Sequence, residues 1–286
     1  AVSEHFGADV PYQEFVELGT IASLARAVER PREAGAVVEL ARGAGTPLVC
    51  VPGHDGVLLG LTRMAHELNG AVPVWGLDFA KLPEATSVSE LAGHCTEALT
   101  RRQPHGPYRL AGVCFGGCVA LEMARELQAR GETVELLALV DTLNPDWARH
   151  QSFRSVAAAW LRNMGIRTAY HCTRLRRMGM RQALRYLAGR SEMFFRNKWE
   201  LTAGRYGHGS GRYRELMRVF RPGEWTGDAL VVRRPGRHLD APLLGWSSIV
   251  RGKLEVADVP FELEGSLAGE NAGRVAALIR ARLGAR

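Results

Sequence analysis

The sequence has 286 residues and contains no apolar run of about 18 residues, the length that a membrane-spanning helix requires. Its first residues lack the basic start and the apolar centre of a secretory signal peptide. The cysteines show no metal-ligand spacing, and their odd number excludes a complete set of disulfides. They are five: Cys50, Cys95, Cys114, Cys118 and Cys172. We therefore expect a cytoplasmic globular protein with reduced thiols, no membrane partner and no metal site.

Acidic residues are scarce in one segment. Between Arg149 and Arg221 the chain has 17 Lys and Arg residues and three acidic ones, within a net charge of +7. Apolar residues recur there at helical spacing, which predicts amphipathic helices with a basic outer face. That face is either simply solvated or suited to an acidic protein or a phosphate-bearing substrate. No DNA- or RNA-binding motif accompanies the charge, so we expect no nucleic-acid partner.

Short apolar runs alternate with helical patterns from residue 47 onward. We expect strands over residues 47–53, 73–79, 108–114, 134–141, 228–234 and 252–259. Because helical patterns separate most of them, the order predicts an α/β domain with a mainly parallel sheet and helices on both faces. A helical insertion over about 146–220 interrupts the alternation. Residues 1–30 form a separate small unit, and residues 31–46, rich in Ala, Gly and Arg, are expected to be a linker.

The stretch Gly112-Val113-Cys114-Phe115-Gly116 joins an expected strand to an expected helix. It has the nucleophile-elbow form Gly-x-Ser-x-Gly, with sulfur in place of oxygen. At such a turn the side chain projects at the carboxyl end of the sheet, and the helix N-terminus favours thiolate over thiol. We therefore expect Cys114 to be a nucleophile; the alternative is a buried small residue, as expected for Cys118.

Backbone N–H groups for an oxyanion are expected from two places. One is Phe115, directly after the cysteine. The other is the loop "VPGHDG", residues 51–56, where Gly53 and His54 follow the first strand of the α/β unit. The alternative for this loop is a plain glycine turn.

These motifs resemble the thioesterase domains that end modular polyketide synthases and nonribosomal peptide synthetases. The resemblance runs over residues 47–286, and it rests on "PLVCVPGHDG", "HGPYRLAGVCFGGCVALEMARELQARGETVELLALVDT" and "GWSSIVRGKLEVADVP". It implies an α/β-hydrolase fold in which the insertion over 146–220 is a lid. It also implies an acyl substrate that arrives as a thioester on the phosphopantetheine of an acyl or peptidyl carrier protein, with no bound cofactor. Residues 5–28 resemble the end of such a carrier, so residues 1–30 are expected to be its C-terminal tail.

The resemblance also implies the other members of a catalytic triad. Asp141 stands where the family often carries the acid that orients the base. The family's histidine follows Val-Pro after the last strand, but here Leu263 stands in its place, and no histidine follows His238. His54, in the oxyanion loop, and His238, after the strand over 228–234, are the two candidates for a substitute base.

Loss of the base would change the reaction. Cysteine forms a nucleophilic anion far more readily than serine does. Water, however, needs general-base help that contributes on the order of 10²–10⁴ in rate. The sequence therefore favours chain release or acyl transfer through a Cys114 acyl-enzyme to a nucleophile other than water, including cyclisation. The alternatives are a trans-acting acyl- or aminoacyltransferase between carriers, a non-catalytic thioesterase-like module and, last, nucleic-acid binding. A homodimer through the lid or the N-terminus is left open.

Overall fold

The computed structural model describes residues 35–53, 56, 58–150, 210–234, 243–259 and 270–284, together with residue 267 and isolated positions between 161 and 182. The carrier-like tail expected over 1–30 lies outside these residues, as does most of the lid expected over 146–220. The described part is built around a sheet of seven strands in the order β1-β3-β2-β4-β5-β6-β7. Their bounds are β1 (Val37–Ala41), β2 (Leu48–Val51), β3 (Val74–Leu77), β4 (Tyr108–Val113), β5 (Val134–Val140), β6 (Ala229–Arg233) and β7 (Leu254–Asp258).

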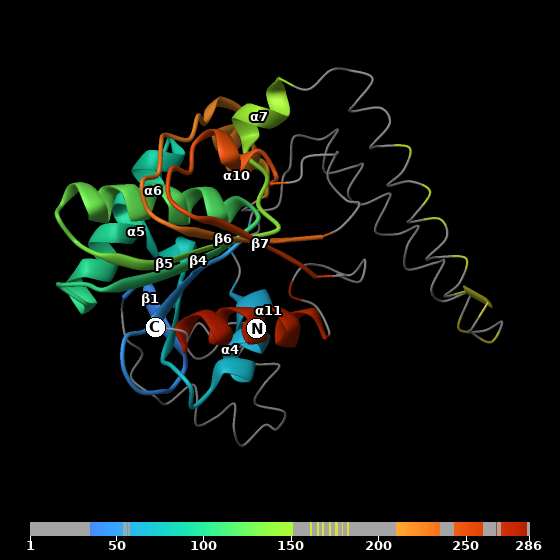
Figure 1. Ribbon diagram of the computed structural model, residues 1–286, viewed down its shortest axis with the longest axis horizontal. Coiled ribbons are helices and arrows are strands. Elements are labelled where there is room, and N and C mark those ends of the chain that lie inside the picture. The colour runs from blue at the N-terminus through green and yellow to red at the C-terminus, as the bar shows by residue number, and fades with distance from the viewer. Residues whose placement is uncertain are drawn as a thin grey trace, which may run out of the picture.

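Every neighbouring pair in the sheet is parallel except β1 with β3, which confirms the mainly parallel α/β architecture. Helices cover both faces (Figure 1). On one face α5 (Val88–Arg102) packs against α6 (Phe115–Ala129), and on the other α4 (Leu59–Leu68) packs against α11 (Asn271–Leu283). Two short 3-10 helices, η1 (Phe79–Lys81) and η2 (Trp246–Ser248), lie in the connections.

Two hydrophobic cores lie between the sheet and its helices, because successive side chains of a strand point to opposite faces. In β5, Leu137 and Leu139 belong to the core beneath α5 and α6, whereas Ala138 and Val140 belong to the core beneath α4 and α11. Both sets are almost fully buried. This two-sided burial explains why the strand reads as a continuous apolar run in the sequence.

The prediction of a linker over residues 31–46 is wrong for residues 37–41, which form β1 at one edge of the sheet. Val37 joins the core beneath α5 and α6, while Val38 and Leu40 pack against the other core. Arg102 of α5 donates to the Val37 carbonyl oxygen at 3.0 Å. The pattern was hidden because the strand is only five residues long and is flanked by Ala, Gly and Arg.

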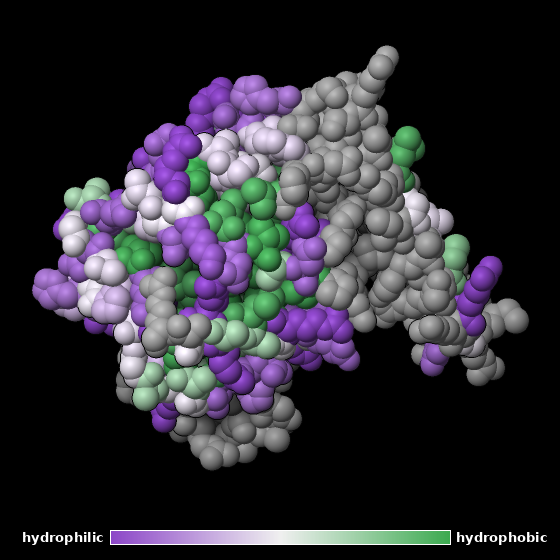
Figure 2. Space-filling model, in the orientation of Figure 1, coloured by the Kyte–Doolittle hydropathy of each residue, from purple (hydrophilic) through white to green (hydrophobic). Residues whose placement is uncertain are grey.

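The other edge of the sheet is β7, whose residues from Leu254 to Ala257 are half-buried. Leu254 and Val256 pack against the core beneath α5 and α6. Figure 2 shows one face of the molecule in the orientation of Figure 1. Hydrophobic residues gather in the middle of that face, and hydrophilic residues surround them.

The long connection from β5 to β6 begins with α7 (Pro145–Arg149) and ends with α10 (Ser210–Val219). Side-chain contacts join these two helices where the connection begins and ends. Arg149 donates to the carbonyl oxygen of Phe220, which follows α10, and Arg221 forms an ion pair with Asp146 of α7. Across the described residues, no helix combines the length and the apolar character needed to cross a membrane.

Candidate active site

Cys114 stands at the sharp turn between β4 and α6. It is the N-cap residue of α6, with φ 52° and ψ −115°, a conformation that side-chain-bearing residues rarely adopt. Its backbone N–H donates to the Val140 carbonyl oxygen at 2.9 Å, which continues the β4–β5 ladder by one step. The residue is half-buried. The turn therefore has the geometry expected of a nucleophile elbow, with the cysteine at the helix N-terminus.

The glycines around Cys114 are required by close backbone packing. A Cβ atom at Gly112 would lie 2.2 Å from the carbonyl oxygen of Gly116. A Cβ atom at Gly116 would lie 2.2 Å from the carbonyl oxygen of Pro52, at the end of β2. The first turn of α6 thus lies directly against the start of the loop that follows β2.

This contact bears on the expected oxyanion hole. Val51 is paired with Gly112 in the parallel register of β2 and β4, so Gly53 and Cys114 each lie two residues beyond a paired position. Gly53 is half-buried, and its carbonyl oxygen accepts from the N–H of Gly56 at 3.0 Å. This hydrogen bond holds Gly56 close to Gly53, beside the elbow. The roles of Gly53 and of the Phe115 N–H in binding an oxyanion stay predictions.

The side chain of Phe115 belongs to an aromatic cluster, so its backbone is the part available for chemistry. Its ring stacks on Tyr213 of α10, with centroids 4.9 Å apart. Phe79 meets Phe115 edge-on at 6.3 Å and Tyr213 at 5.5 Å. The cluster packs the end of the β5–β6 insertion against the residue that follows the nucleophile.

Asp141 lies at the end of the strand next to Cys114. Val113 is paired with Val140 in the β4–β5 register, so Cys114 and Asp141 leave adjacent strands at the same level. Asp141 also has a positive φ, 50°, and its N–H donates to the Val232 carbonyl oxygen at 2.7 Å. The residue is 3% exposed. The structure thus brings the expected acid and the expected nucleophile to one edge of the sheet.

The loop after Asp141 is held by buried hydrogen bonds. The indole N–H of Trp246 donates to the Thr142 carbonyl oxygen at 2.7 Å, and the amide of Asn144 donates to the Gly245 carbonyl oxygen at 2.8 Å. Thr142, Asn144 and Trp246 are all buried. Because these bonds satisfy polar groups in the interior, they fix the path of the chain directly after the acid.

Arg234, which directly follows β6, was not among the residues expected at the site. Its Nη2 atom lies 3.5 Å from Oδ2 of Asp141, and the two side chains are 13% and 1% exposed. The acid is therefore in a largely buried ion pair with a guanidinium. The signal was available, because Arg234 ends the strand expected over 228–234, and strand ends at this edge carry the site.

The residues proposed as a base lie outside the described part of the chain. His54, His238 and Leu263 all fall there, so the identity of the base stays a prediction. Within the described ranges, no group of three or more His, Cys, Asp or Glu side chains is arranged to hold a metal ion.

Three of the other described cysteines differ sharply from Cys114. Cys50, Cys95 and Cys118 are fully buried. Burial raises the pKa of the Cys50 thiol to about 12. It also raises the pKa values of the Cys95 and Cys118 thiols. Cys118 is thus a core residue, as predicted, and these three thiols are poor nucleophiles at neutral pH.

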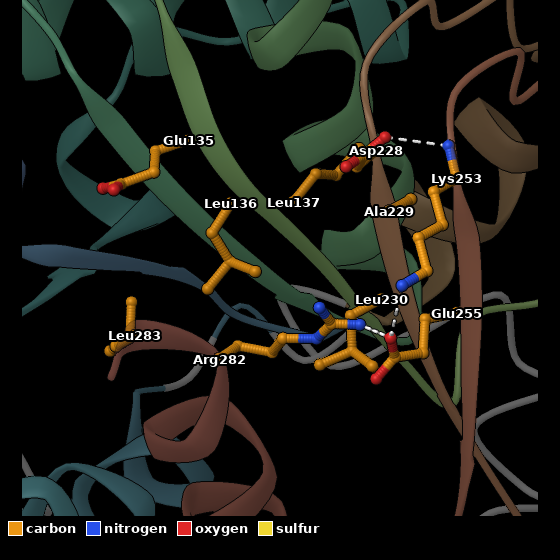
Figure 3. Close-up of a pocket in the computed structure, with 10 residues that line it drawn as sticks. All are labelled: Glu135, Leu136, Leu137, Asp228, Ala229, Leu230, Lys253, Glu255, Arg282 and Leu283. Carbon is orange, nitrogen blue, oxygen red and sulfur yellow. Dashed lines mark hydrogen bonds and ion pairs between the residues drawn. The ribbon is translucent and has the colours of Figure 1, made fainter. Parts of the chain in front are cut away.

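A small cavity of about 40 Å³ lies at the opposite, amino end of β5, β6 and β7, beside the end of α11 (Figure 3). A backbone hydrogen bond and two ion pairs join several of the residues that line it. The Lys253 N–H donates to Asp228 at 2.8 Å, and Glu255 forms ion pairs with Arg282 and with Lys253. The expected nucleophile and the expected acid lie at the other, carboxyl end of the sheet.

Comparison with known proteins agrees with this geometry. Indigoidine synthase of Streptomyces lavendulae is 33% identical over 169 residues, which cover 53% of this chain and 13% of the synthase. Vanchrobactin synthetase VabF of Vibrio anguillarum is 34% identical over 116 residues, which cover 39% of this chain and 4% of the synthetase. The chain thus corresponds to a small part of these longer relatives.

Among solved structures, the fold is similar to that of the NocB thioesterase domain in covalent complex with a fluorophosphonate nocardicin G analogue. The TM-score is 0.58 at 23% identity, over 84% of this chain and 96% of that one. The family described as "Thioesterase domain" matches residues 46–195. Since this match covers more than half of the sequence and includes the elbow, the chain belongs to the thioesterase domain family.

Proposed function

We propose that this domain takes an acyl or peptidyl chain from a carrier-bound thioester onto Cys114 and passes it to a nucleophile other than water. Members of the thioesterase family are acyl-transfer or hydrolytic enzymes, and the relatives are synthetases. The observation that carries the proposal is Cys114 itself, half-buried at a left-handed elbow and at the N-terminus of α6.

In the loading step the Cys114 thiolate attacks the thioester carbonyl carbon. The oxyanion that forms accepts hydrogen bonds from the Phe115 N–H and from the loop at Gly53. When it collapses, the bond to the carrier's sulfur breaks, and the pantetheine thiolate leaves and takes up a proton. One thioester replaces another, so the step is close to isoenergetic.

The second step decides the product. A water molecule needs a base to attack the acyl-enzyme, whereas an amine or a stabilised carbanion can attack unaided. The resemblance puts Leu263 in the place of the family's histidine, and this favours such an acceptor, either within the chain being released or on a second molecule. Asp141 is the proposed acid, and His54 and His238 are the residues proposed as a substitute base.

The proposed partner is the acyl or peptidyl carrier protein that delivers the substrate. Its phosphopantetheine arm belongs to the carrier, and the domain itself requires no cofactor. Residues 1–30 are proposed to be the tail of that carrier, which would place donor and acceptor thiols on one chain. The relatives are synthetases much longer than this chain, in keeping with such an arrangement.

Intact-protein mass spectrometry after incubation with S-hexanoyl-N-acetylcysteamine tests the proposal. We expect a hexanoyl adduct that persists for minutes, is absent in Cys114→Ala and disappears when a primary amine is added. The matched control is Cys172→Ala, which removes the exposed cysteine in the insertion and should keep the adduct.

Two outcomes would contradict the proposal. Rapid release of free acid without an adduct, dependent on Cys114, would mean that a base serves water, and His54→Ala would be the next variant. Neither adduct nor turnover on folded protein with any acyl thioester would favour a non-catalytic module.

A further inference from the structure

Cys114, Asp141 and Arg234 directly follow three neighbouring parallel strands, β4, β5 and β6. The registers Val113–Val140 and Val140–Val232 put Cys114 and Asp141 at the same level of the sheet and Arg234 one residue further along. Adjacent strands lie about 4.8 Å apart. The nucleophile, the acid and a guanidinium therefore follow one another along a single edge, with Asp141 in the middle.

We propose that Arg234 is a positioning residue that neutralises Asp141, so that the Cys114 thiolate forms beside an ion pair instead of beside a lone carboxylate. The inference rests on the proposed function in one respect, since it takes Cys114 to be the nucleophile. It goes further by assigning the acid a permanent cationic partner.

The geometry supports this role through the burial of both charges. A carboxylate as buried as that of Asp141 is costly unless a cation or several donors compensate it. Nη2 of Arg234 is 3.5 Å from its Oδ2, and a guanidinium stays charged at any pH the protein meets. Arginine can neither accept nor relay a proton there, so its effect on Cys114 is electrostatic.

The sign of that effect follows from the charges. A lone carboxylate near a thiol raises the thiol pKa, and a nearby cation lowers it. The described elements bring Asp141 from β5, Arg234 from β6 and Cys118 from α6 toward Cys114, with Tyr213 of α10 above Phe115. Burial raises the pKa of the Cys118 thiol, and among the described residues Asp141 and Arg234 form the charged pair that follows the strands beside Cys114.

The test is the pH dependence of Cys114 alkylation by iodoacetamide, followed by mass spectrometry of the Cys114 peptide in a Cys172→Ala background. In Arg234→Met the midpoint should rise by about one pH unit, because Asp141 loses its counter-charge. In Asp141→Asn it should fall, because the negative charge beside Cys114 is removed while the guanidinium stays. The double variant should return close to the starting value, and Arg234→Lys should stay near it.

The matched control is Arg233→Met. Arg233 is the preceding residue and pairs with Asp258 of β7, so its loss should leave the midpoint unchanged. An equal midpoint in folded Arg234→Met would overturn the proposal. If that variant does not fold, the absence of a downward shift in Asp141→Asn would overturn it instead.

This experiment is independent of acyl transfer. A Cys114 that is alkylated with the expected midpoints but never carries an acyl group would contradict the proposed function and leave the role of Arg234 standing. A stable acyl adduct combined with unchanged alkylation midpoints would support the proposed function and contradict the role of Arg234.

Discussion

The two ends of the central sheet are built differently. At the carboxyl end, Cys114 and Asp141 both have left-handed backbone angles, and the charged pair of Asp141 and Arg234 is buried. At the amino end, Glu255 pairs with Arg282 in a more exposed setting. Strain and buried charge persist only where the surrounding structure enforces them, and they concentrate at functional sites. The comparison teaches that positive backbone angles and a buried ion pair come together at the end of the sheet that carries the proposed nucleophile.

The largest expected effect comes from Gly116→Ala, which breaks the carboxyl end. A Cβ atom there would meet the carbonyl oxygens of Pro52 and Val51, 2.2 and 2.4 Å away. Backbone must move to relieve the clash, and we expect a loss of about 3 kcal/mol in the free energy of unfolding. Urea denaturation measures it, and the acyl adduct on Cys114 should disappear.

The control for that variant is Gly60→Ala in α4, where an added Cβ atom meets nothing within 4 Å. Alanine favours the helix, so we expect stability to rise by up to about 1 kcal/mol. Equal stability losses at both positions would show that the elbow is not specially packed.

A smaller, pH-dependent effect is expected at the amino end from Glu132→Gln. The Gly106 N–H donates to Glu132 at 2.7 Å, and this bond, together with His105, holds the carboxyl pKa below its ordinary value of 4.5. A depressed pKa stabilises the fold above pH 4.5, and that stability is lost as the pH falls further through the folded-state pKa. The difference in Tm between the wild type and the variant should therefore be largest at neutral pH and shrink in acid. A difference that is constant with pH would contradict this assignment.

The smallest effect is expected from Glu255→Gln, at the amino end beside the cavity. The side chains of Glu255 and Arg282 are 40% and 31% exposed, and ion pairs of this kind contribute less than about 1 kcal/mol. Thermal unfolding should detect at most a small change, and acylation of Cys114 should be unaffected. A loss comparable to that of Gly116→Ala would remove the distinction between the two ends.

Much of the fold could be predicted because the parallel strands are buried on both faces. β2, β4 and β5 appear as short apolar runs in the sequence. β1 was missed since an edge strand buries little surface and needs no long apolar run. Its place depends on pairing with β3, which no local pattern reveals.

The residues of the candidate site likewise fall into two groups, those that a local sequence pattern predicts and those that depend on contacts between distant segments. Cys114 could be found because the elbow imposes glycines at fixed spacing, a local requirement. The ion pair between Asp141 and Arg234 depends on the register of β5 and β6, and the two residues are 93 positions apart in the chain. The aromatic contact between Phe115 and Tyr213 is equally non-local. Sequence patterns report what one segment requires of itself, and these contacts are made between segments.

The hydrogen bond that joins the two ends of the insertion has a consequence for chain entropy. Arg149 meets the Phe220 carbonyl oxygen across 71 residues, so the insertion leaves and re-enters the domain at one place. The entropy of closing such a loop grows only logarithmically, by about 0.6 kcal/mol for each doubling of its length. The insertion can therefore lengthen or shorten at little thermodynamic cost to the domain, while the sheet edge that carries Cys114 stays where it is.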